Sequence, residues 1–78
     1  MNQIKVLGTG CASCRATEKL IRSVLEATGK VAQVEKVEDL PSIMKYGVLS
    51  TPGVVIDGKV VHAGGIPTRQ QVEQWLSA

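Results

Sequence analysis

The sequence predicts an α/β protein in the order β-α-β-α-β-β-α, with a four-stranded mixed sheet and helices on both faces. Short runs rich in Val and Ile alternate with longer segments of helical periodicity, and an Asp-Gly pair separates the last two runs. Of the 78 residues, 44% are hydrophobic, which is enough to build a core. A chain of this length suits one unit, so we expect a single domain over residues 1–78.

The chain opens with a strand and a long helix. Ile4 to Leu7 is a short apolar run that ends at Gly8-Thr9-Gly10, which predicts a buried strand followed by a tight turn. A helix is expected from Ala12, because apolar residues recur at helical spacing until Gly29, and glycine commonly ends helices. The apolar positions of this helix are Ala16, Leu20, Ile21, Val24, Leu25 and Ala27.

A second strand and a short helix follow. Valines recur over residues 31–37 with polar residues between them, which indicates a strand with one wet side or an edge position. Asp39 can cap a short helix that ends at Gly47, since the first turn of a helix tolerates Pro41. The apolar stripe of this helix is expected to be Leu40, Ile43 and Met44.

The last part of the chain predicts a hairpin and a final helix. Val54 to Ile56 and Val60 to Ala63 are joined by Asp57-Gly58-Lys59, a strong signal for two antiparallel strands. Thr68 and Gln71 have the spacing of a capping box at the start of a helix. A right-handed crossover makes the first two strands parallel, so the sheet should be mixed. The expected core residues of the last helix are Val72, Trp75 and Leu76.

Charge and composition exclude several classes of function. Nine basic and seven acidic residues give a formal net charge of +2 and are scattered without a run of one sign, so we expect no nucleic-acid partner. Residues 1–10 contain neither a secretory signal nor a stretch able to span a bilayer. We therefore expect a cytoplasmic protein with no membrane partner, which acts as a monomer.

The chemistry is expected at Cys11-Ala12-Ser13-Cys14, directly at the start of the long helix. A cysteine there meets unpaired backbone N–H groups and the positive end of the helix dipole, which favour the nucleophilic thiolate. Cys11 lies on the exposed turn, whereas Cys14 lies one turn further on and is partly shielded. The spacing therefore predicts Cys11 as the attacking thiol and Cys14 as the thiol that resolves the mixed disulfide.

Neighbouring residues add little to this assignment. Arg15 could add positive potential and Ser13 could donate a hydrogen bond to a thiolate, but an ordinary solvated first turn explains both. A bridge between Cys11 and Cys14 closes almost no loop, so it removes little entropy from the unfolded chain. In a reducing compartment such a pair is more often catalytic or metal-binding than structural.

With this pattern the chain resembles the thioredoxin superfamily, especially its short single-domain redox-active disulfide proteins, the mini-thioredoxins and glutaredoxin-like proteins. In that family the C-x-x-C opens the first helix and a cis-proline before the third strand lies against it. The C-x-x-C at Cys11 and Cys14 matches the first feature, and Thr51-Pro52 matches the second. The resemblance covers nearly the whole chain and implies a thioredoxin-like fold.

The resemblance also implies a thiol–disulfide oxidoreductase that uses no cofactor. Its substrate would be a protein or small-molecule disulfide, and a reductase or thiol donor would return it to the dithiol form. Cys11 and Cys14 would be catalytic, Pro52 would be cis, and the backbone of Thr51 would pair with a substrate strand.

The chain departs from the larger thioredoxins at three points. Gly10 stands where they carry Trp, Ala12-Ser13 replaces Gly-Pro, and Lys5 occupies the position of their acidic strand residue. These differences bear on the redox potential and the reductant. Gly64-Gly65 lies where glutaredoxin-like members have a Gly pair near glutathione, although turn geometry explains such a pair equally well.

Two other functions remain as alternatives. The loop from Gly8 to Cys14 also resembles the Cu(I)-binding loop of heavy-metal-associated domains, and thiolates suit Cu(I). That family ends on a strand and carries a Met ahead of its motif, and this chain shows neither feature. The other alternative is a non-enzymatic redox sensor or interaction module, in which the disulfide switches a binding surface.

No metal site is expected. Two thiols and the lone His62 do not complete the four ligands of structural zinc, and His62 is interpreted as a satisfied or exposed strand residue. Met44, Tyr46 and Trp75 are interpreted as core or core-edge residues.

Overall fold

The computed structural model describes residues 2–77, in which the elements follow the predicted order β-α-β-α-β-β-α. The strands lie in the sheet order β2-β1-β3-β4, with β1 parallel to β2 and the other pairs antiparallel. The mixed four-stranded sheet is therefore confirmed. The elements are β1 (Asn2–Leu7), α1 (Ala12–Thr28), β2 (Ala32–Val37), α2 (Leu40–Lys45), β3 (Gly53–Ile56), β4 (Lys59–Ala63) and α3 (Arg69–Ser77).

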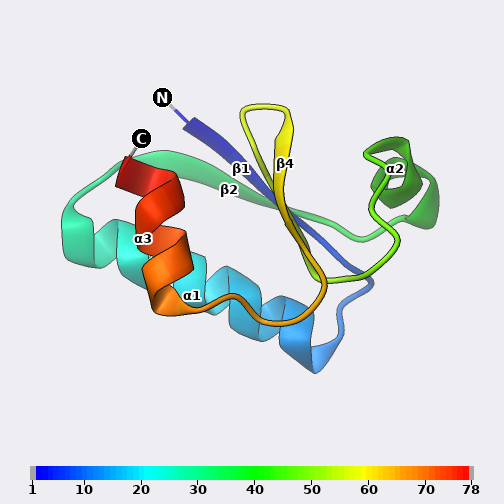
Figure 1. Ribbon diagram of the computed structural model, residues 1–78, viewed down its shortest axis with the longest axis horizontal. Coiled ribbons are helices and arrows are strands. Elements are labelled where there is room, and N and C mark those ends of the chain that lie inside the picture. Colours follow the sequence, from blue (N-terminus) through cyan, green and yellow to red (C-terminus); the bar gives the residue numbers. More distant parts are fainter. Residues whose placement is uncertain (1, 78) are drawn as a thin grey trace.

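Helices cover both faces of the sheet, as Figure 1 shows: α1 and α3 lie together on one side of the strands, and α2 lies apart from them. Because side chains alternate along a strand, Ile4 and Val6 of β1 face α1 and α3, whereas Leu7 faces α2. The larger core lies under α1 and α3 and consists of Ile4, Val6, Ile21, Val24, Leu25, Val54, Val72 and Leu76. The smaller core lies under α2 and consists of Leu7, Val37, Ile43, Val48 and Val55.

The predicted helix ends are present. Gly29 ends α1 in the left-handed conformation, with φ of 68°. Asp39 caps α2, and hydrogen bonds from the Ser42 hydroxyl and backbone N–H lower the pKa of its carboxyl group. Thr68 and Gln71 form the capping box before α3, with each side chain accepting from the other's backbone N–H at 2.9 and 3.1 Å.

The hairpin turn between β3 and β4 also agrees with the sequence. Asp57 and Gly58 both have positive φ, 50° and 83°, as a type I′ turn requires. The Asp57 carboxylate accepts a hydrogen bond from the backbone N–H of Gln3 at 2.8 Å. The turn is thereby tied to the beginning of the central strand.

The buried face of α1 differs from the apolar stripe expected from the sequence. Ala16 and Ala27 are exposed, while Thr17 is fully buried. Thr17 can be buried because its hydroxyl donates to the Ser13 carbonyl at 2.8 Å, which satisfies its polar group within the helix. The periodicity indicates the helix correctly, but its inward face also contains polar and sulfur-bearing residues. The buried residues of α1 are Cys14, Thr17, Ile21, Val24 and Leu25.

Three other apolar residues were expected to be structural and are exposed. Val31 precedes β2 and is 78% exposed, so it lies outside the strand. Leu40 and Met44 are 59% and 67% exposed, and the interpretation of Met44 as a core residue is wrong. Helix α2 has only six residues, and Ile43 is its one buried residue. Tyr46 and Trp75 pack at the edges of the two cores, as expected.

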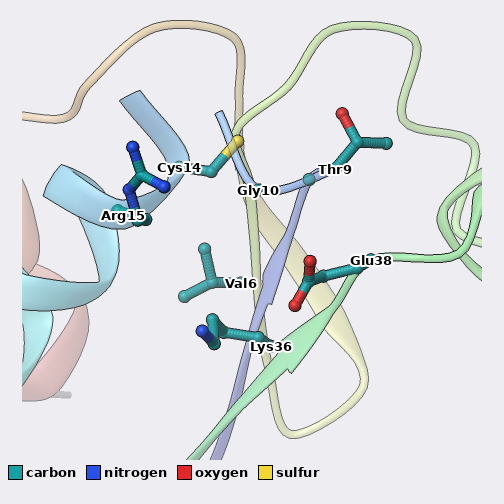
Figure 2. A pocket seen from close by; sticks show the side chains of 8 residues that line it. Val6, Thr9, Gly10, Cys14, Arg15, Lys36 and Glu38 are labelled. Carbon is teal, nitrogen blue, oxygen red and sulfur yellow. The ribbon is translucent and has the colours of Figure 1, made fainter. Parts of the chain in front are cut away.

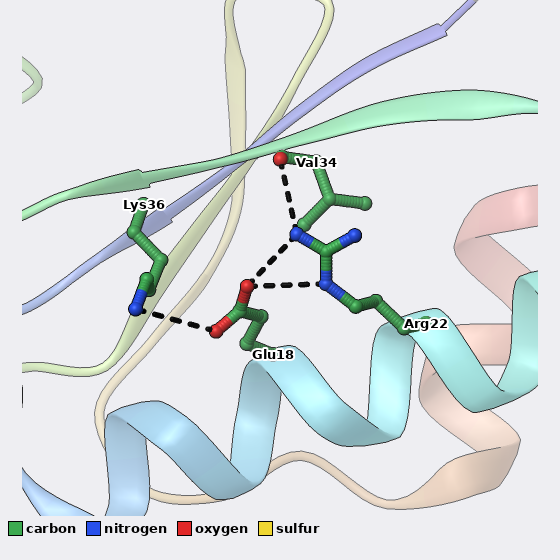
Figure 3. Close-up of polar contacts among 4 residues, drawn as sticks. All are labelled: Glu18, Arg22, Val34 and Lys36. Carbon is green, nitrogen blue, oxygen red and sulfur yellow. Dashed lines mark hydrogen bonds and ion pairs between the residues drawn. The ribbon is translucent and has the colours of Figure 1, made fainter.

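A polar cluster ties α1 to the edge strand β2 (Figure 3). The Arg22 guanidinium bonds the Glu18 carboxylate at 2.9 and 3.1 Å and donates to the Val34 carbonyl at 3.3 Å. The other Glu18 oxygen lies 3.9 Å from the Lys36 ammonium. These contacts hold the middle of α1 against the sheet, and the cysteines lie at the N-terminal end of the same helix.

Candidate functional site

The two cysteines lie where β1 gives way to α1, and they form a disulfide with Cα atoms 5.1 Å apart. Cys11 is the N-cap of α1 and has an extended backbone, with φ of −67° and ψ of 163°. Its sulfur accepts a hydrogen bond from the backbone N–H of Cys14 at 3.2 Å. One of the unpaired donors at the helix end therefore already points at the Cys11 sulfur.

The two sulfurs have different surroundings. Cys11 is exposed, whereas Cys14 is only 5% exposed and lies on the buried face of α1. This asymmetry agrees with the expectation from position along the helix. The first turn of α1 contains no acidic residue that would oppose a thiolate on Cys11.

Gly8 brings the cysteines and the Thr51-Pro52 segment together. A Cβ atom placed on Gly8 would overlap the Cys14 sulfur, lie 3.1 Å from Cys14 Cβ and lie 3.7 Å from Thr51 Cβ. Gly8 is therefore packed directly against the second cysteine and lies close to the segment that precedes β3. Sequence reasoning assigned Gly8 only to a turn, because nothing local in the sequence indicates what packs against it.

The Thr51–Pro52 peptide bond is cis, as expected. Pro52 is fully buried and Thr51 is exposed at the surface. The Pro52 carbonyl accepts a hydrogen bond from the Gly64 N–H at 2.9 Å, which joins this segment to the turn after β4. The segment before β3 is thus held to a stretch of chain that is distant in sequence.

A cavity of about 280 Å³ lies beside Cys14, between the start of α1 and the end of the sheet. Figure 2 shows Cys14 and Arg15 on the α1 side of this cavity, with Lys36 and Glu38 on the side of β2. Gly10 has φ of 84°, and a Cβ on it would lie 3.2 Å from a Glu38 carboxylate oxygen. Nothing in the sequence indicates that Lys36 and Glu38 line a cavity with Cys14, because they come from another part of the chain.

Lys5 lies on the opposite face of the central strand from this cavity. Its ammonium donates to the Tyr46 hydroxyl at 3.1 Å and lies 5.7 Å from the centre of the Tyr46 ring. The hydrogen bond to Tyr46 raises the pKa of Lys5 most, and the negative charge of Glu35 raises it further. Lys5 is therefore engaged with Tyr46, whereas Val6, the next residue, lines the cavity beside Cys14.

His62 and the metal-ligating side chains of residues 2–77 can be placed as well. The His62 ring nitrogen Nε2 lies 2.9 Å from the Gly65 carbonyl oxygen, so the expectation of a satisfied strand histidine is confirmed. Within these residues no group of three or more His, Cys, Asp or Glu side chains is arranged to hold a metal ion. None of the helices described has the length and apolar character needed to cross a membrane.

Comparison with known proteins gives consistent results. A family model described as thioredoxin domain matches residues 2–77. Thioredoxin of Methanothermobacter thermautotrophicus is 31% identical over 77 residues, covering 99% of this chain and all of the relative. Thioredoxin of Methanocaldococcus jannaschii is 33% identical over 75 residues, covering 96% of this chain and 86% of the relative.

Solved structures with lower identity share the fold. A mutant thioredoxin from Halobacterium salinarum superposes with a TM-score of 0.71 at 22% identity, covering 97% of this chain and 72% of the other. Chloroplastic thioredoxin z superposes with a TM-score of 0.72 at 19% identity, covering 99% of this chain and 76% of the other.

Proposed function

The chain belongs to the thioredoxin family and is a thiol–disulfide oxidoreductase, and we propose that Cys11 attacks the substrate disulfide while Cys14 resolves the intermediate. The observation that carries this assignment is the difference in exposure between the two cysteines. Cys11 is exposed and its sulfur already accepts a helix N–H, whereas Cys14 is buried. An incoming disulfide can reach only the first of them without a rearrangement of α1.

The reaction then proceeds in two exchange steps. In the reduced protein the Cys11 thiolate attacks one substrate sulfur, a bond forms between these sulfurs, and the other substrate sulfur leaves as a thiolate that takes up a proton. Cys14 next loses its proton and attacks the Cys11 sulfur. The Cys11–Cys14 disulfide forms and the second substrate sulfur leaves, so two electrons have passed from the dithiol to the substrate.

The helix end supports the first step. The backbone N–H of Cys14 that bonds the Cys11 sulfur in the disulfide form can donate to the same sulfur when it is a thiolate. Helix α1 has 17 residues, and its dipole favours negative charge at this end. Both effects stabilise the thiolate of Cys11 as attacking and as leaving group.

Thr51 and Pro52 are proposed to form the edge against which the substrate lies. Thr51 is exposed, and its Cβ and the Cys14 side chain both lie close to the position that a Cβ on Gly8 would take. An extended peptide on either side of a substrate cysteine could pair with the exposed backbone there, as strands added to a sheet edge do.

The partners implied are a protein or small-molecule disulfide and a reductase or thiol donor that restores the dithiol. We further propose action in the cytoplasm, where reducing conditions keep C-x-x-C thiols available for turnover.

The test uses two single variants of the reduced protein. Cys14→Ser should trap a disulfide substrate on Cys11 as a stable mixed disulfide, because attack proceeds and resolution cannot. Cys11→Ser is the matched control and should trap nothing. Mass spectrometry after incubation with oxidised glutathione or insulin would reveal the adducts.

Two results would contradict the assignment. Adducts of equal yield in both variants would show that the cysteines are interchangeable. Tight Cu(I) binding by the wild type, weakened by either variant and accompanied by no disulfide reduction, would favour metal transfer instead.

A further inference from the structure

Strand β4 contains an irregularity close to the proposed substrate edge. Its pairing with β3 runs Val54 to His62 and then Val55 to Val60, so Val61 is an extra residue without a partner. Such a β-bulge changes the face on which the neighbouring side chains lie. Val60 packs against the core under α2, whereas Val61 packs against the core under α1 and α3.

The bulge also places His62 on the face of α3. His62 pairs with Val54, whose side chain belongs to the core under α1 and α3. Its ring lies against Trp75 of α3, with ring centroids 5.6 Å apart and an interplanar angle of 46°. Strict alternation from Val61 would have turned His62 toward the other face. The bulge and Trp75 together therefore determine where the imidazole lies.

The imidazole reaches the turn that follows β4. Nε2 of His62 lies 2.9 Å from the Gly65 carbonyl oxygen. A carbonyl only accepts, so Nε2 must carry the proton and donate. The preceding residue, Gly64, donates its N–H to the Pro52 carbonyl at 2.9 Å. The turn is thus bonded to Pro52 through Gly64 and to His62 through Gly65.

The turn itself requires glycine and lies close to the residues before Pro52. Gly64 and Gly65 have φ of 88° and 75°, which other residues rarely adopt. A Cβ on Gly64 would lie 3.1 Å from Ser50 Cβ, so this turn is packed closely against the residues before Pro52. A shift of the turn would therefore alter the surroundings of Thr51 and Pro52.

We propose that His62 is a positioning residue that holds the Gly64-Gly65 turn against the Pro52 segment and thereby sets the edge on which a disulfide substrate binds. This rests on the proposed role of Thr51 and Pro52 in substrate binding. His62 acts through the turn, so its loss weakens substrate binding and leaves the reactivity of Cys11 unchanged.

The test compares His62→Leu, which removes the donor and keeps an apolar side chain, with His62→Gln, whose amide can donate to the same carbonyl. Ser77→Ala is the control. It removes a comparable hydrogen bond, from the Ser77 hydroxyl to the Gln74 carbonyl three residues earlier, which lies within α3. Three quantities are measured: KM and kcat for insulin reduction driven by dithiothreitol, hydrogen exchange of the Gly64 amide, and alkylation of Cys11 by iodoacetamide.

In His62→Leu we expect KM to rise about fivefold and Gly64 exchange to accelerate about fivefold, the effect of losing one hydrogen bond of about 1 kcal/mol. The kcat and the alkylation rate should stay within about twofold of the wild type on the same basis. His62→Gln should restore both affected quantities, and Ser77→Ala should change neither.

The proposal is overturned if His62→Leu leaves Gly64 exchange or KM at the wild-type value, or if His62→Gln behaves as His62→Leu does. If His62→Leu does not fold, His62→Asn replaces it, because its shorter amide cannot reach Gly65. Failure of the wild type to reduce insulin would contradict the proposed function instead, and Gly64 exchange would still decide whether His62 holds the turn.

Discussion

Replacing Gly8 with Ala tests the packing at the centre of the site. The added methyl group would overlap the Cys14 sulfur and lie 3.1 Å from Cys14 Cβ. Thr51 Cβ would be in ordinary contact with the same methyl group at 3.7 Å, so the overlap concerns Cys14. Gly8 does not have a left-handed backbone, so the effect of Ala arises from this overlap and not from strain in φ.

The size of the effect follows from two opposing contributions. Overpacking a close-packed site by one methyl group costs about 1–3 kcal/mol. Replacing Gly by Ala also restricts the unfolded chain, which stabilises the fold by about 0.4–1 kcal/mol. The free energy of unfolding should therefore fall by about 1–2 kcal/mol. In a domain of this size each kcal/mol lowers Tm by about 4–8 °C, so Tm should fall by about 5–15 °C.

The loss of stability in Gly8→Ala should depend on whether Cys11 and Cys14 form the disulfide. In the oxidised protein the disulfide holds the Cys14 sulfur, whereas in the reduced protein Cys14 can adopt another rotamer and move away from the methyl group. Thermal unfolding followed by circular dichroism, with and without dithiothreitol, should therefore show the larger fall in Tm for the oxidised form. The variant should also favour the dithiol in a redox titration against glutathione.

Gly53→Ala is the matched control, because Gly53 also lacks a left-handed backbone and its added Cβ would meet Val48 Cγ1 at 3.0 Å. The end of a Val side chain can shift more readily than a disulfide, so this variant should lose less stability and show no redox dependence. Equal losses of stability in Gly8→Ala with and without dithiothreitol would refute the reasoning. So would a Gly8→Ala protein as stable as the wild type.

Two further predictions concern residues away from the cysteines. Asp39→Ala should lower the free energy of unfolding at neutral pH through loss of the cap on α2, measured by urea denaturation. The pKa of Asp39 is lower in the folded than in the unfolded chain, so protonation of Asp39 favours unfolding. The difference in free energy of unfolding between Asp39→Ala and the wild type should therefore vanish as the pH falls through the Asp39 pKa. A difference that persists in acid would contradict this. Lys5→Ala should leave the pH profile of Cys11 alkylation nearly unchanged, because the Lys5 ammonium is bonded to Tyr46 on the face of β1 away from the cavity beside Cys14. A large alkaline shift of that profile would show that Lys5 acts on the thiols.

Most of the fold could be predicted because its signals are local. Gly29 ends α1, Asp39 caps α2, and the Asp57-Gly58 turn joins the last two strands, each by the short-range chemistry that the sequence indicates. The same holds for the position of Cys11 at the start of α1. Each of these features depends on residues no more than a few positions apart.

The errors arose where packing between elements decides the outcome. Ile43 and Met44 both have helical spacing from Leu40, but only Ile43 is buried in so short a helix. Thr17 would not be chosen as a core residue by hydropathy, yet its hydroxyl is satisfied by Ser13 and its side chain is buried. Neither burial could be inferred without knowing which elements meet.

The same distinction between local and long-range signals separates the cysteines from the proposed substrate edge. The thiol chemistry needs only a helix end and a three-residue spacing, and both are visible in the sequence at Cys11 and Cys14. The edge needs Pro52, Gly64 and His62 to meet from separate segments, and the bulge at Val61 that orients His62 has no sequence signal of its own. Substitutions around this edge can therefore change which disulfides bind while the C-x-x-C stays the same. In this chain, substitutions of the residues that position the turn after β4 should accordingly change substrate preference more than substitutions of the two residues between the cysteines.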